Sequence, residues 1–428
     1  MAEQTQIVTT EKVINGGQAL ATLSDGKKCF IWGALDKEEV EIKITKNKKD
    51  WCEATVVRVI KSSPKRIEPV DSKTFMSTSP WQIMDYEYEK NVKNDILSEL
   101  YERAKIKVSW SSFYQSVDDL HYRNKMEYNF WFDKETEKVS LALHERGTHK
   151  KLIISDCGIA SEFINEAGSR LIDFINKHEI PARSLKSVII RTTEIGEVHA
   201  SLYLKDKAIE KKITGLDKLF DGLEIIYSNP KSPASVTTEL LDTFGANAMH
   251  DLLRENNFLY TSRSFFQVNL EPYEIALNDI ASQITDKDAN VIDFYCGVGS
   301  IGLSVARDKK LILVDSDEES IKIAKLNTKS IKTVEVINSK SEEALNLING
   351  DATIILDPPR AGLHISLVDK LTNVRPHKII YLSCNPSTQA RDAKMLIDAG
   401  YTITYGRGYN FFPRTPHIES LLVFSNVQ

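Results

Sequence analysis

The sequence has no long apolar segment and no recognisable targeting signal. No run of about 18 apolar residues occurs, which is the length that a membrane-spanning helix requires. The amino terminus, Met-Ala-Glu-Gln-Thr-Gln, lacks the basic and apolar regions of a secretory signal. Apolar residues make up 42% of the chain and charged residues 27%, as in ordinary globular proteins. We therefore expect a cytoplasmic protein with no membrane partner.

Cysteine is scarce, and its spacing shows no pairing. The five cysteines are odd in number and include no Cys-x-x-Cys pair: Cys29, Cys52, Cys157, Cys296 and Cys384. This distribution favours a reducing compartment and argues against a disulfide framework and against a structural zinc site. We expect no bound metal.

An excess of positive charge is also missing. The net charge of −5 excludes a bulk polycation that binds nucleic acid without discrimination, so any nucleic-acid contact must be local. One basic cluster falls within 24 residues: Lys43, Lys46, Lys48, Lys49, Arg58, Lys61, Lys65 and Arg66. Such a cluster is typical either of a solvated face or of a phosphate-binding surface, and the two interpretations have equal weight here.

The 428 residues are too many for one simple core, and their pattern divides into three parts. Residues 1–62 contain short, evenly spaced strands between glycines and polar turns, which predicts a small β-barrel. Residues 63–255 contain a linker punctuated by serine and proline, a helix over 86–104, and an α+β pattern with a helix over 160–178. A second basic surface, with Arg146, Lys150 and Lys151, is one interpretation of this part; ordinary edge-strand charge is the other.

Strands and helices alternate regularly in the third part, residues 256–428. From about residue 288 the apolar runs alternate between strand and helix, including a helix over 342–348, and two closing strands follow near 401–406 and 419–424. This alternation predicts an α/β domain with a Rossmann-like, doubly wound parallel sheet, and the closing pair predicts an antiparallel edge.

The most informative stretch is residues 380–392, which places Cys384 at the end of a buried strand. Asn385-Pro386 forces a turn immediately afterwards, and Ser387 is suited to cap a following helix. In open parallel sheets, ligands bind at the carboxyl ends of the strands. Free cysteines are otherwise often buried and inert. The position of Cys384 at a strand end and the turn that follows it favour a reactive thiol here.

A glycine turn follows the first strand of the alternating region. In Asp293-Phe-Tyr-Cys-Gly-Val-Gly-Ser300, Gly297 and Gly299 let backbone approach a ligand closely. Asp315 ends the next strand, where a carboxylate accepts hydrogen bonds from ribose hydroxyls. Because Gly302 completes a three-glycine pattern, the glycines alone leave a dinucleotide site open. Asp357-Pro-Pro-Arg360 and Cys384 favour S-adenosylmethionine instead.

Five motifs in order and in register resemble the RNA uracil-5-methyltransferase family: Ser264-Phe-Phe-Gln-Val-Asn269, Asp293-Phe-Tyr-Cys-Gly-Val-Gly299, Asp357-Pro-Pro-Arg-Ala-Gly362, Ser383-Cys-Asn-Pro386 and His417-Ile-Glu-Ser420. The resemblance extends over nearly the whole chain. It implies a class I methyltransferase domain at residues 256–428, a TRAM-like RNA-binding barrel at residues 1–62 and a central RNA-binding domain at residues 63–255.

The resemblance also implies residue roles and partners. Cys384 is the expected nucleophile and Glu419 the expected base. The expected cofactor is S-adenosylmethionine, and its expected contacts are Gln267, Tyr295, Asp315 and Asp357. The expected substrate is a uridine of 23S ribosomal RNA or transfer RNA, methylated at carbon 5 by a monomer through a covalent cysteine–uracil intermediate.

One departure from the family concerns iron and sulfur. Many relatives hold a cluster on four cysteines just after the barrel, whereas Phe75-Met-Ser-Thr-Ser-Pro80 contains none. A cluster needs thiolates, so we expect no iron–sulfur cluster.

Two alternative functions would require different residues at the positions of Cys384, Glu419 and Asp357. A catalytically silent RNA-binding protein on this fold would lose the thiol or the carboxylate, and Cys384 and Glu419 are both present. An amino-group methyltransferase would use the acidic Pro-Pro loop at Asp357 and would need no thiol.

Overall fold

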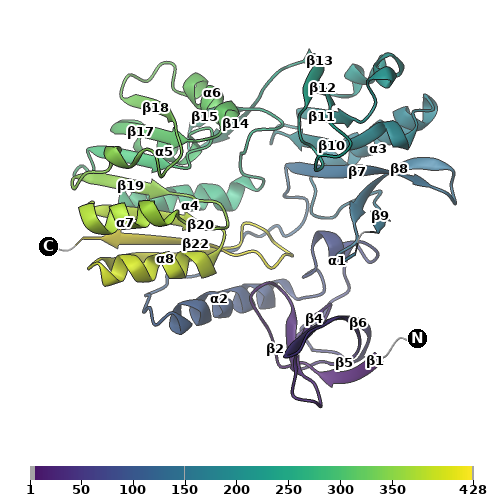
Figure 1. The fold of residues 1–428 in the computed structure, drawn as a ribbon, viewed down its shortest axis with the longest axis horizontal. Helices are drawn as coiled ribbons and strands as arrows, with labels where there is room; N and C mark the ends of the chain where they lie inside the picture. The colour runs from purple at the N-terminus through teal and green to yellow at the C-terminus, as the bar shows by residue number, and fades with distance from the viewer. Residues whose placement is uncertain (1–4, 149, 427–428) are drawn as a thin grey trace.

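A computed structural model describes residues 5–148 and 150–426 of the chain. Its strands form one six-stranded sheet, two seven-stranded sheets and one two-stranded hairpin. Figure 1 shows three bodies, with helix α2 lying along the third body next to the amino-terminal one. Among the helices of the described residues, none is long and apolar enough to cross a membrane.

The amino-terminal sheet curls around its own small core (Figure 1). Its strand order is β1-β5-β6-β4-β3-β2. Irregular register between β5 and β6 lets these long strands bend, as bulges do in closed sheets. The strands are β1 (Thr5–Thr9), β2 (Lys12–Val13), β3 (Ala19–Thr22), β4 (Lys28–Trp32), β5 (Glu39–Asn47) and β6 (Trp51–Lys61).

The central sheet carries a helix on one face only. Its order is β13-β12-β11-β10-β7-β8-β9, and α3 packs over β8, β10 and β11. The elements are β7 (Lys125–Asp133), β8 (Lys138–His144), β9 (Lys151–Ile153), α3 (Glu162–Lys177), η1 (Ala182–Ser184), β10 (Leu185–Thr192), β11 (Val198–Leu204), η2 (Lys207–Ile213), η3 (Leu216–Leu219), β12 (Gly222–Tyr227) and β13 (Glu239–Gly245).

The third sheet has helices on both faces, with strand order β18-β17-β16-β19-β20-β22-β21. Its first five strands are parallel. The inner strands are largely apolar because both faces of the sheet are buried, whereas the edge strand β18 is only partly buried. The strands are β16 (Asn290–Phe294), β17 (Lys310–Asp315), β18 (Val334–Asn338), β19 (Ala352–Leu356), β20 (Lys378–Ser383), β21 (Thr402–Tyr409) and β22 (Glu419–Ser425).

Helices α2, α7 and α8 share the core on one face of this sheet, and α4, α5 and α6 share the core on the other. Side chains alternate between the two cores along β20, where Ile379 and Tyr381 face the first and Ile380 and Leu382 face the second. The remaining elements are α1 (Phe75–Thr78), α2 (Tyr86–Arg103), β14 (Met249–Leu253), β15 (Asn256–Tyr260), α4 (Leu270–Gln283), α5 (Ser300–Ala306), α6 (Glu318–Asn327), η4 (Leu345–Leu347), α7 (Ile365–Val374) and α8 (Pro386–Asp398).

Two details differ from the sequence-based expectations. The helix expected over 342–348 is wrong: only η4, a single 3-10 turn, forms there. Ala344 and Ile348 bury their apolar side chains without a helix, and seven residues are too few to nucleate one independently. The closing pair is antiparallel, but β22 lies inside the sheet between β20 and β21, so only β21 forms the edge.

A buried ion pair fixes α2 against the third body. Glu89 and Lys93 are both fully buried, with Lys93 Nζ 2.9 Å from Glu89 Oε1. Asn410 donates a hydrogen bond to Glu89 from Nδ2 at 2.9 Å, and the Arg414 backbone N–H donates to both carboxylate oxygens at 3.1 Å. Burial lowers the pKa of Lys93, and the neighbouring Glu89 opposes that shift.

We expect Lys93→Met to destabilise the protein by about 3 kcal/mol, because it leaves the buried Glu89 charge without its partner. Urea denaturation followed by tryptophan fluorescence measures the loss. Lys12→Met is the matched control, since it breaks an exposed Lys12–Glu99 pair to the same helix and should cost less than about 1 kcal/mol. Equal shifts in the two variants would contradict this account.

Candidate active site

The thiol and the carboxylate meet where two antiparallel strands pass each other. Cys384 directly follows β20, and Glu419 begins β22. The register pairs Ser383 with Ser420, so one further step places Cys384 opposite Glu419. Glu419 is 4% exposed, and Cys384 is the one cysteine among the described residues that is only partly buried.

The turn after Cys384 is held by side chains on both sides. Asn385 accepts a hydrogen bond from the Ser387 N–H and donates one from Nδ2 to the Arg360 carbonyl at 2.9 Å. Pro386 opens α8 with its fixed backbone angle. The thiol is thus tied to the loop that follows β19.

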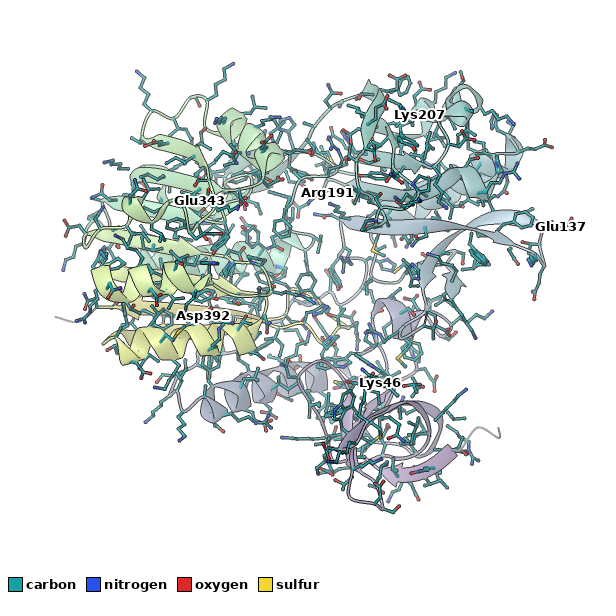
Figure 2. All side chains as sticks on the ribbon, viewed as in Figure 1. Lys46, Glu137, Arg191, Lys207, Glu343 and Asp392 are labelled. Carbon is teal, nitrogen blue, oxygen red and sulfur yellow. The ribbon has the colours of Figure 1, made fainter. Side chains whose placement is uncertain are left out.

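Helix α8 holds that loop in place through Asp392. Asp392, labelled in Figure 2, accepts hydrogen bonds from the Leu363 N–H and the Tyr381 hydroxyl, both at 2.9 Å. Gly362 has a φ of +80°, and a Cβ there would lie 2.8 Å from an Asp392 oxygen. The loop therefore requires glycine at this position, and its packing on α8 leaves Asp357 and Arg360 at the sheet edge.

Several buried carboxyl groups converge at this edge. Burial raises the pKa of Asp293 to about 8, with repulsion from Asp357 and Asp315 adding to the effect. Burial raises the pKa of Asp357 to about 7. Burial and the nearby Asp357 also raise the pKa of Glu419 well above its usual range, while Arg360 opposes the shift. Asp293 Oδ1 is buried with no hydrogen-bond partner among the described residues. The edge is therefore suited to a positively charged ligand.

The same charges act on the thiol. Burial raises the pKa of Cys384 to about 12, Glu419 and Asp357 reinforce the shift, and Arg360 opposes it. Arg360 Nη2 lies 2.9 Å from His417 Nδ1. Burial and the charge of Arg360 lower the pKa of His417 to about 3, so the ring is neutral and accepts from the guanidinium. His417 thus positions Arg360, the cation that opposes the raised pKa values of Cys384 and Glu419.

The glycine turn after β16 forms the other half of the site. Tyr295 and Gly297 have φ values of +65° and +56°, and a non-glycine residue in this conformation is strained. The Gly297 N–H donates to Asp315 at 2.8 Å, and the Tyr295 hydroxyl lies 2.8 Å from Ser341 Oγ. A hollow of about 630 Å³ lies beside Tyr295 and Ser341.

The central body positions Gln267. Arg191 of β10 is fully buried and donates hydrogen bonds to the carbonyls of Ser264, at 2.8 Å, and Phe266, at 2.7 Å. Its guanidinium also lies 4.5 Å from the centre of the Tyr260 ring. Figure 2 shows Arg191 between the two large bodies. The side-chain amide of Gln267 itself has no hydrogen-bond partner among the described residues, which leaves it available to a ligand.

A turn of the barrel contacts the segments that carry Cys384 and Glu419. Asn15 Nδ2 donates to Ser387 Oγ at 3.0 Å, beside the Cys384 turn. The Gly17 carbonyl accepts a hydrogen bond from the Trp81 indole at 3.0 Å. The backbone of Gly17 lies so close to Pro416 that a Cβ would be 2.7 Å from the proline ring.

The structure brings the predicted site residues into one connected arrangement. Cys384, Glu419 and Asp357 influence one another electrostatically. Tyr295 lies on the adjoining glycine turn, and Asp315, at the end of β17, accepts a hydrogen bond from that turn. The sequence reasoning missed Asp293, Arg191 and the contacts of Arg360 with His417. A carboxylate inside the apolar run of β16 and an arginine inside that of β10 are the signals that would have found the first two.

A family model for tRNA (uracil-5-)-methyltransferases matches residues 85–427. The chain belongs to this family. The resemblance drawn from the five motifs is therefore confirmed, and the protein is a methyltransferase.

Proteins of similar length are similar to this chain over nearly all of it. An RNA methyltransferase of Prochlorococcus marinus, itself uncharacterised, is 31% identical over 91% of this chain and 98% of the relative. One from Thermotoga maritima is 28% identical over 98% of both chains. The solved tRNA (uracil-54, C5)-methyltransferase of Pyrococcus abyssi, in complex with S-adenosyl-L-homocysteine, is 24% identical, with a TM-score of 0.79 over 97% of this chain and all of that one. The predicted fold is confirmed: an α/β class I methyltransferase domain with an amino-terminal barrel and a central α+β domain.

We expect Gly17→Ala to lower the methyl-transfer rate per folded molecule roughly tenfold, because the new Cβ displaces Pro416 and with it the loop carrying Glu419. Gly16→Ala is the matched control. Gly16 has nearly the same φ, +95° against +99°, and no atom within 4 Å of the added Cβ. Both variants carry the same backbone strain, and only Gly17→Ala adds a clash, so thermal unfolding should occur at a lower temperature in Gly17→Ala and the rates are compared per folded molecule. Equal rates in the two variants would show that the barrel turn does not position the loop.

Proposed function

We propose that this methyltransferase uses S-adenosylmethionine to methylate carbon 5 of a uridine in RNA, through a covalent bond from Cys384 to carbon 6 of uracil. The position of Cys384 opposite Glu419, at the acidic edge of the sheet, carries the proposal. A nucleophile and a base on the same sheet edge are what this reaction needs.

The acidic edge supports S-adenosylmethionine over a dinucleotide. S-Adenosylmethionine carries a positive sulfonium and an ammonium group, whereas a dinucleotide carries a pyrophosphate. A bound cation stabilises the ionised forms of Asp357 and of Asp293, which has one unpartnered buried oxygen, whereas a pyrophosphate would oppose their ionisation. The S-adenosyl-L-homocysteine in the Pyrococcus abyssi structure is consistent with this choice of cofactor.

Five residues are placed to hold the cofactor. Asp315, already oriented by the Gly297 N–H, has lone pairs left for ribose hydroxyls. Tyr295 and Ser341 border the hollow of about 630 Å³, which is large enough for adenine. Asp357 faces the cationic part of the ligand, and the Gln267 amide offers both a donor and an acceptor.

Carbon 5 of uracil is a poor nucleophile until electrons are pushed into the ring. Addition of the Cys384 thiolate to carbon 6 produces an enolate in which carbon 5 is nucleophilic. S-Adenosylmethionine, when bound, supplies the electrophilic methyl group. Glu419 then takes the proton from carbon 5, and the carbon–sulfur bond breaks to restore the ring. Because the pKa of Glu419 is raised, its ionised form is a stronger base than an exposed carboxylate.

The thiol must lose its proton before it can add. Arg360, held by the neutral ring of His417, favours the thiolate and then the developing enolate. The surrounding carboxyl groups act in the opposite direction, so neutralising their charge with a bound cation favours the thiolate as well. Cofactor binding and thiol activation are therefore coupled through Asp357 and Glu419.

The substrate is a uridine of transfer RNA or 23S ribosomal RNA that is single-stranded or flipped out of its helix, because the reaction needs access to the ring face. The barrel offers part of the binding surface. Lys46, Arg58 and Arg66 of its basic cluster are paired with barrel carboxylates, whereas Lys48 and Lys49 pair with none of the described residues. Nucleoside mass spectrometry of both RNA classes, comparing a deletion strain with its parent, identifies the target.

We expect wild-type protein and S-adenosylmethionine to form a stable covalent adduct with RNA from cells grown on 5-fluorouracil, because fluorine at carbon 5 cannot leave as a proton. Denaturing electrophoresis detects the adduct. Cys384→Ala should form none, while Cys157→Ala, which removes a buried cysteine of the central body, should form as much as wild type. An adduct in Cys384→Ala would reject the covalent mechanism, and full methylation by that variant would select the amino-group alternative.

We expect the affinity for S-adenosylmethionine to rise about tenfold between pH 6 and 8. Asp357, with a pKa of about 7 in the free protein, must lose its proton to attract the sulfonium. Below that pKa the group is neutral and contributes no attraction, so affinity falls with falling pH. Calorimetric titration in buffers of different ionisation enthalpy measures affinity and proton release together.

S-Adenosyl-L-homocysteine provides the matched ligand control, because its sulfur is uncharged and its affinity should change less over the same range. Asp357→Asn should remove the difference between the two ligands. Parallel pH profiles for both ligands with the wild-type protein would place the sulfonium away from Asp357.

A further inference from the structure

The face of the central sheet opposite α3 is buried over β10 and β11 but exposed around Trp131 of β7, and positive charge gathers beside this residue. Along β7, Tyr128 and Phe130 point into the core beneath α3, so Trp131, in the alternate position, lies on the opposite face. Trp131 is 46% exposed. It borders a hollow of about 370 Å³, here called the basic hollow, whose lining includes Lys134, Lys151, Arg183, Lys186 and Lys205. The lining residues include no carboxylate.

Lys186 gives the basic hollow a fixed positive charge. A register shift of β10 against β11 occurs at this residue, and such bulges redirect a side chain. Lys186 is 8% exposed, and its Nζ donates to Ser228 Oγ at 2.8 Å, the Asn229 carbonyl at 2.7 Å and Ser232 Oγ at 2.8 Å. All three acceptors are neutral, so the charge is held in place without being compensated.

The other cations of the hollow add to this charge. Lys151, Lys186 and Lys205 line the same hollow, and burial, followed by the charge of Lys205, lowers the pKa of both Lys151 and Lys186. None of these three, nor Lys134 or Arg183, forms an ion pair with a carboxylate within residues 5–148 and 150–426. Positive charges that repel one another without a counter-charge favour an anionic partner.

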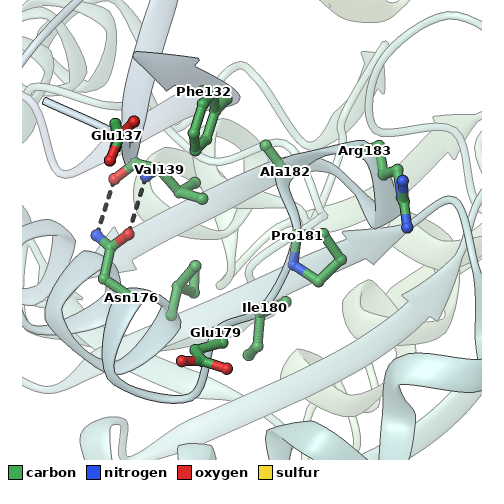
Figure 3. Close-up of a pocket in the computed structure, with 10 residues that line it drawn as sticks. Phe132, Glu137, Val139, Asn176, Glu179, Ile180, Pro181, Ala182 and Arg183 are labelled. Carbon is green, nitrogen blue, oxygen red and sulfur yellow. Dashed lines mark hydrogen bonds between the residues drawn. The ribbon is translucent and has the colours of Figure 1, made fainter. Parts of the chain in front are cut away.

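A neighbouring hollow makes a useful contrast. Figure 3 shows the residues that line it, which include the end of α3. Its volume is about 420 Å³. Phe132, Ala182 and Arg183 line both hollows, but Glu137 and Glu179 border this second one, and it contains no lysine. The two hollows are similar in size but differ in the charge of their lining residues, and of the two the basic hollow is the one complementary to a polyanion.

We propose that the basic hollow is a second contact site for the RNA substrate, outside the catalytic cleft, where the lysines hold phosphates of the backbone and Trp131 stacks on a base. An aromatic face next to unpaired cations is the arrangement that binds single-stranded RNA. This inference rests on the proposed function, because it assumes that RNA is the substrate.

The position of the basic hollow sets its distance from the chemistry. β7 begins beside Asn124, whose side chain donates to the Gln267 carbonyl, and Trp131 lies six residues beyond the first residue of that strand. At roughly 3.3 Å per residue, Trp131 lies about 20 Å along β7 from Lys125, the first residue of the strand. About six stacked nucleotides, at roughly 3.4 Å each, extend over this distance. The site therefore contacts RNA that flanks the target uridine.

The test uses full-length protein and bulk transfer and ribosomal RNA from a strain lacking the enzyme, with Kd measured by fluorescence anisotropy at several KCl concentrations. Trp131→Ala should weaken RNA binding about tenfold, and Trp131→Phe should retain most of the affinity because the stacking face remains. Lys205→Gln should reduce the slope of log Kd against log salt by about one. The losses should appear in Kd and KM for RNA, while affinity for S-adenosylmethionine stays at the wild-type value.

Lys207→Gln is the control, because Lys207 lies on the same body but pairs with Glu239. Ultraviolet crosslinking of 4-thiouridine-containing RNA should in addition label the peptide that contains Trp131. Wild-type affinity and salt slope in Trp131→Ala and Lys205→Gln, with no label on that peptide, would overturn the inference. If wild-type protein makes no 5-methyluridine at all, the proposed function fails; if it does and these variants behave as wild type, only the second contact site fails.

Discussion

The buried carboxylate of Glu89 is the constraint on which the site depends most. A charge without solvent is costly unless every lone pair is occupied, and Glu89 is satisfied only when Lys93, Asn410 and the Arg414 backbone are in place. Helix α2 and the segment around residues 410–414 are therefore locked together. Because that segment leads directly to His417 and Glu419, the position of the proposed base is fixed by a helix that belongs to the connection between the bodies.

Other supports of the site come from equally distant parts of the chain. Arg191 of the central sheet holds the segment that carries Gln267, and the barrel turn at Asn15 and Gly17 contacts the loops on either side of the catalytic pair. The class I domain carries Cys384 and Glu419, while the other two bodies contact the segments on which the proposed site residues lie. Small displacements of reacting groups reduce rates strongly, so these remote contacts bear on the proposed chemistry.

The sequence predicts well what local rules determine. Strand ends follow from apolar runs and turn residues, so the strand-end position of Cys384 and the placement of Asp315 and Asp357 at one sheet edge were predictable. The position of Cys384 opposite Glu419 was not, since it requires β22 to insert beside β20. The hairpin of β14 and β15 was missed because its strands are short, and because Asp251 interrupts β14 and two asparagines begin β15. The basic residues of the barrel show the same limit, because several have carboxylate partners that only the fold brings close.

The segment after the barrel is held by hydrogen bonds between neutral and charged side chains. Gln82 donates to Asp71 at 2.8 Å and to Ser79 Oγ at 2.7 Å. Asp71 in turn accepts from the backbone N–H of Gly158, at 3.0 Å and 3.1 Å, which ties the segment to the central body. Hydrogen bonds to a charged acceptor are shorter and stronger than those between neutral groups. The same segment holds Trp81 against Gly17, so these polar contacts also support the barrel turn that contacts the segments carrying Cys384 and Glu419.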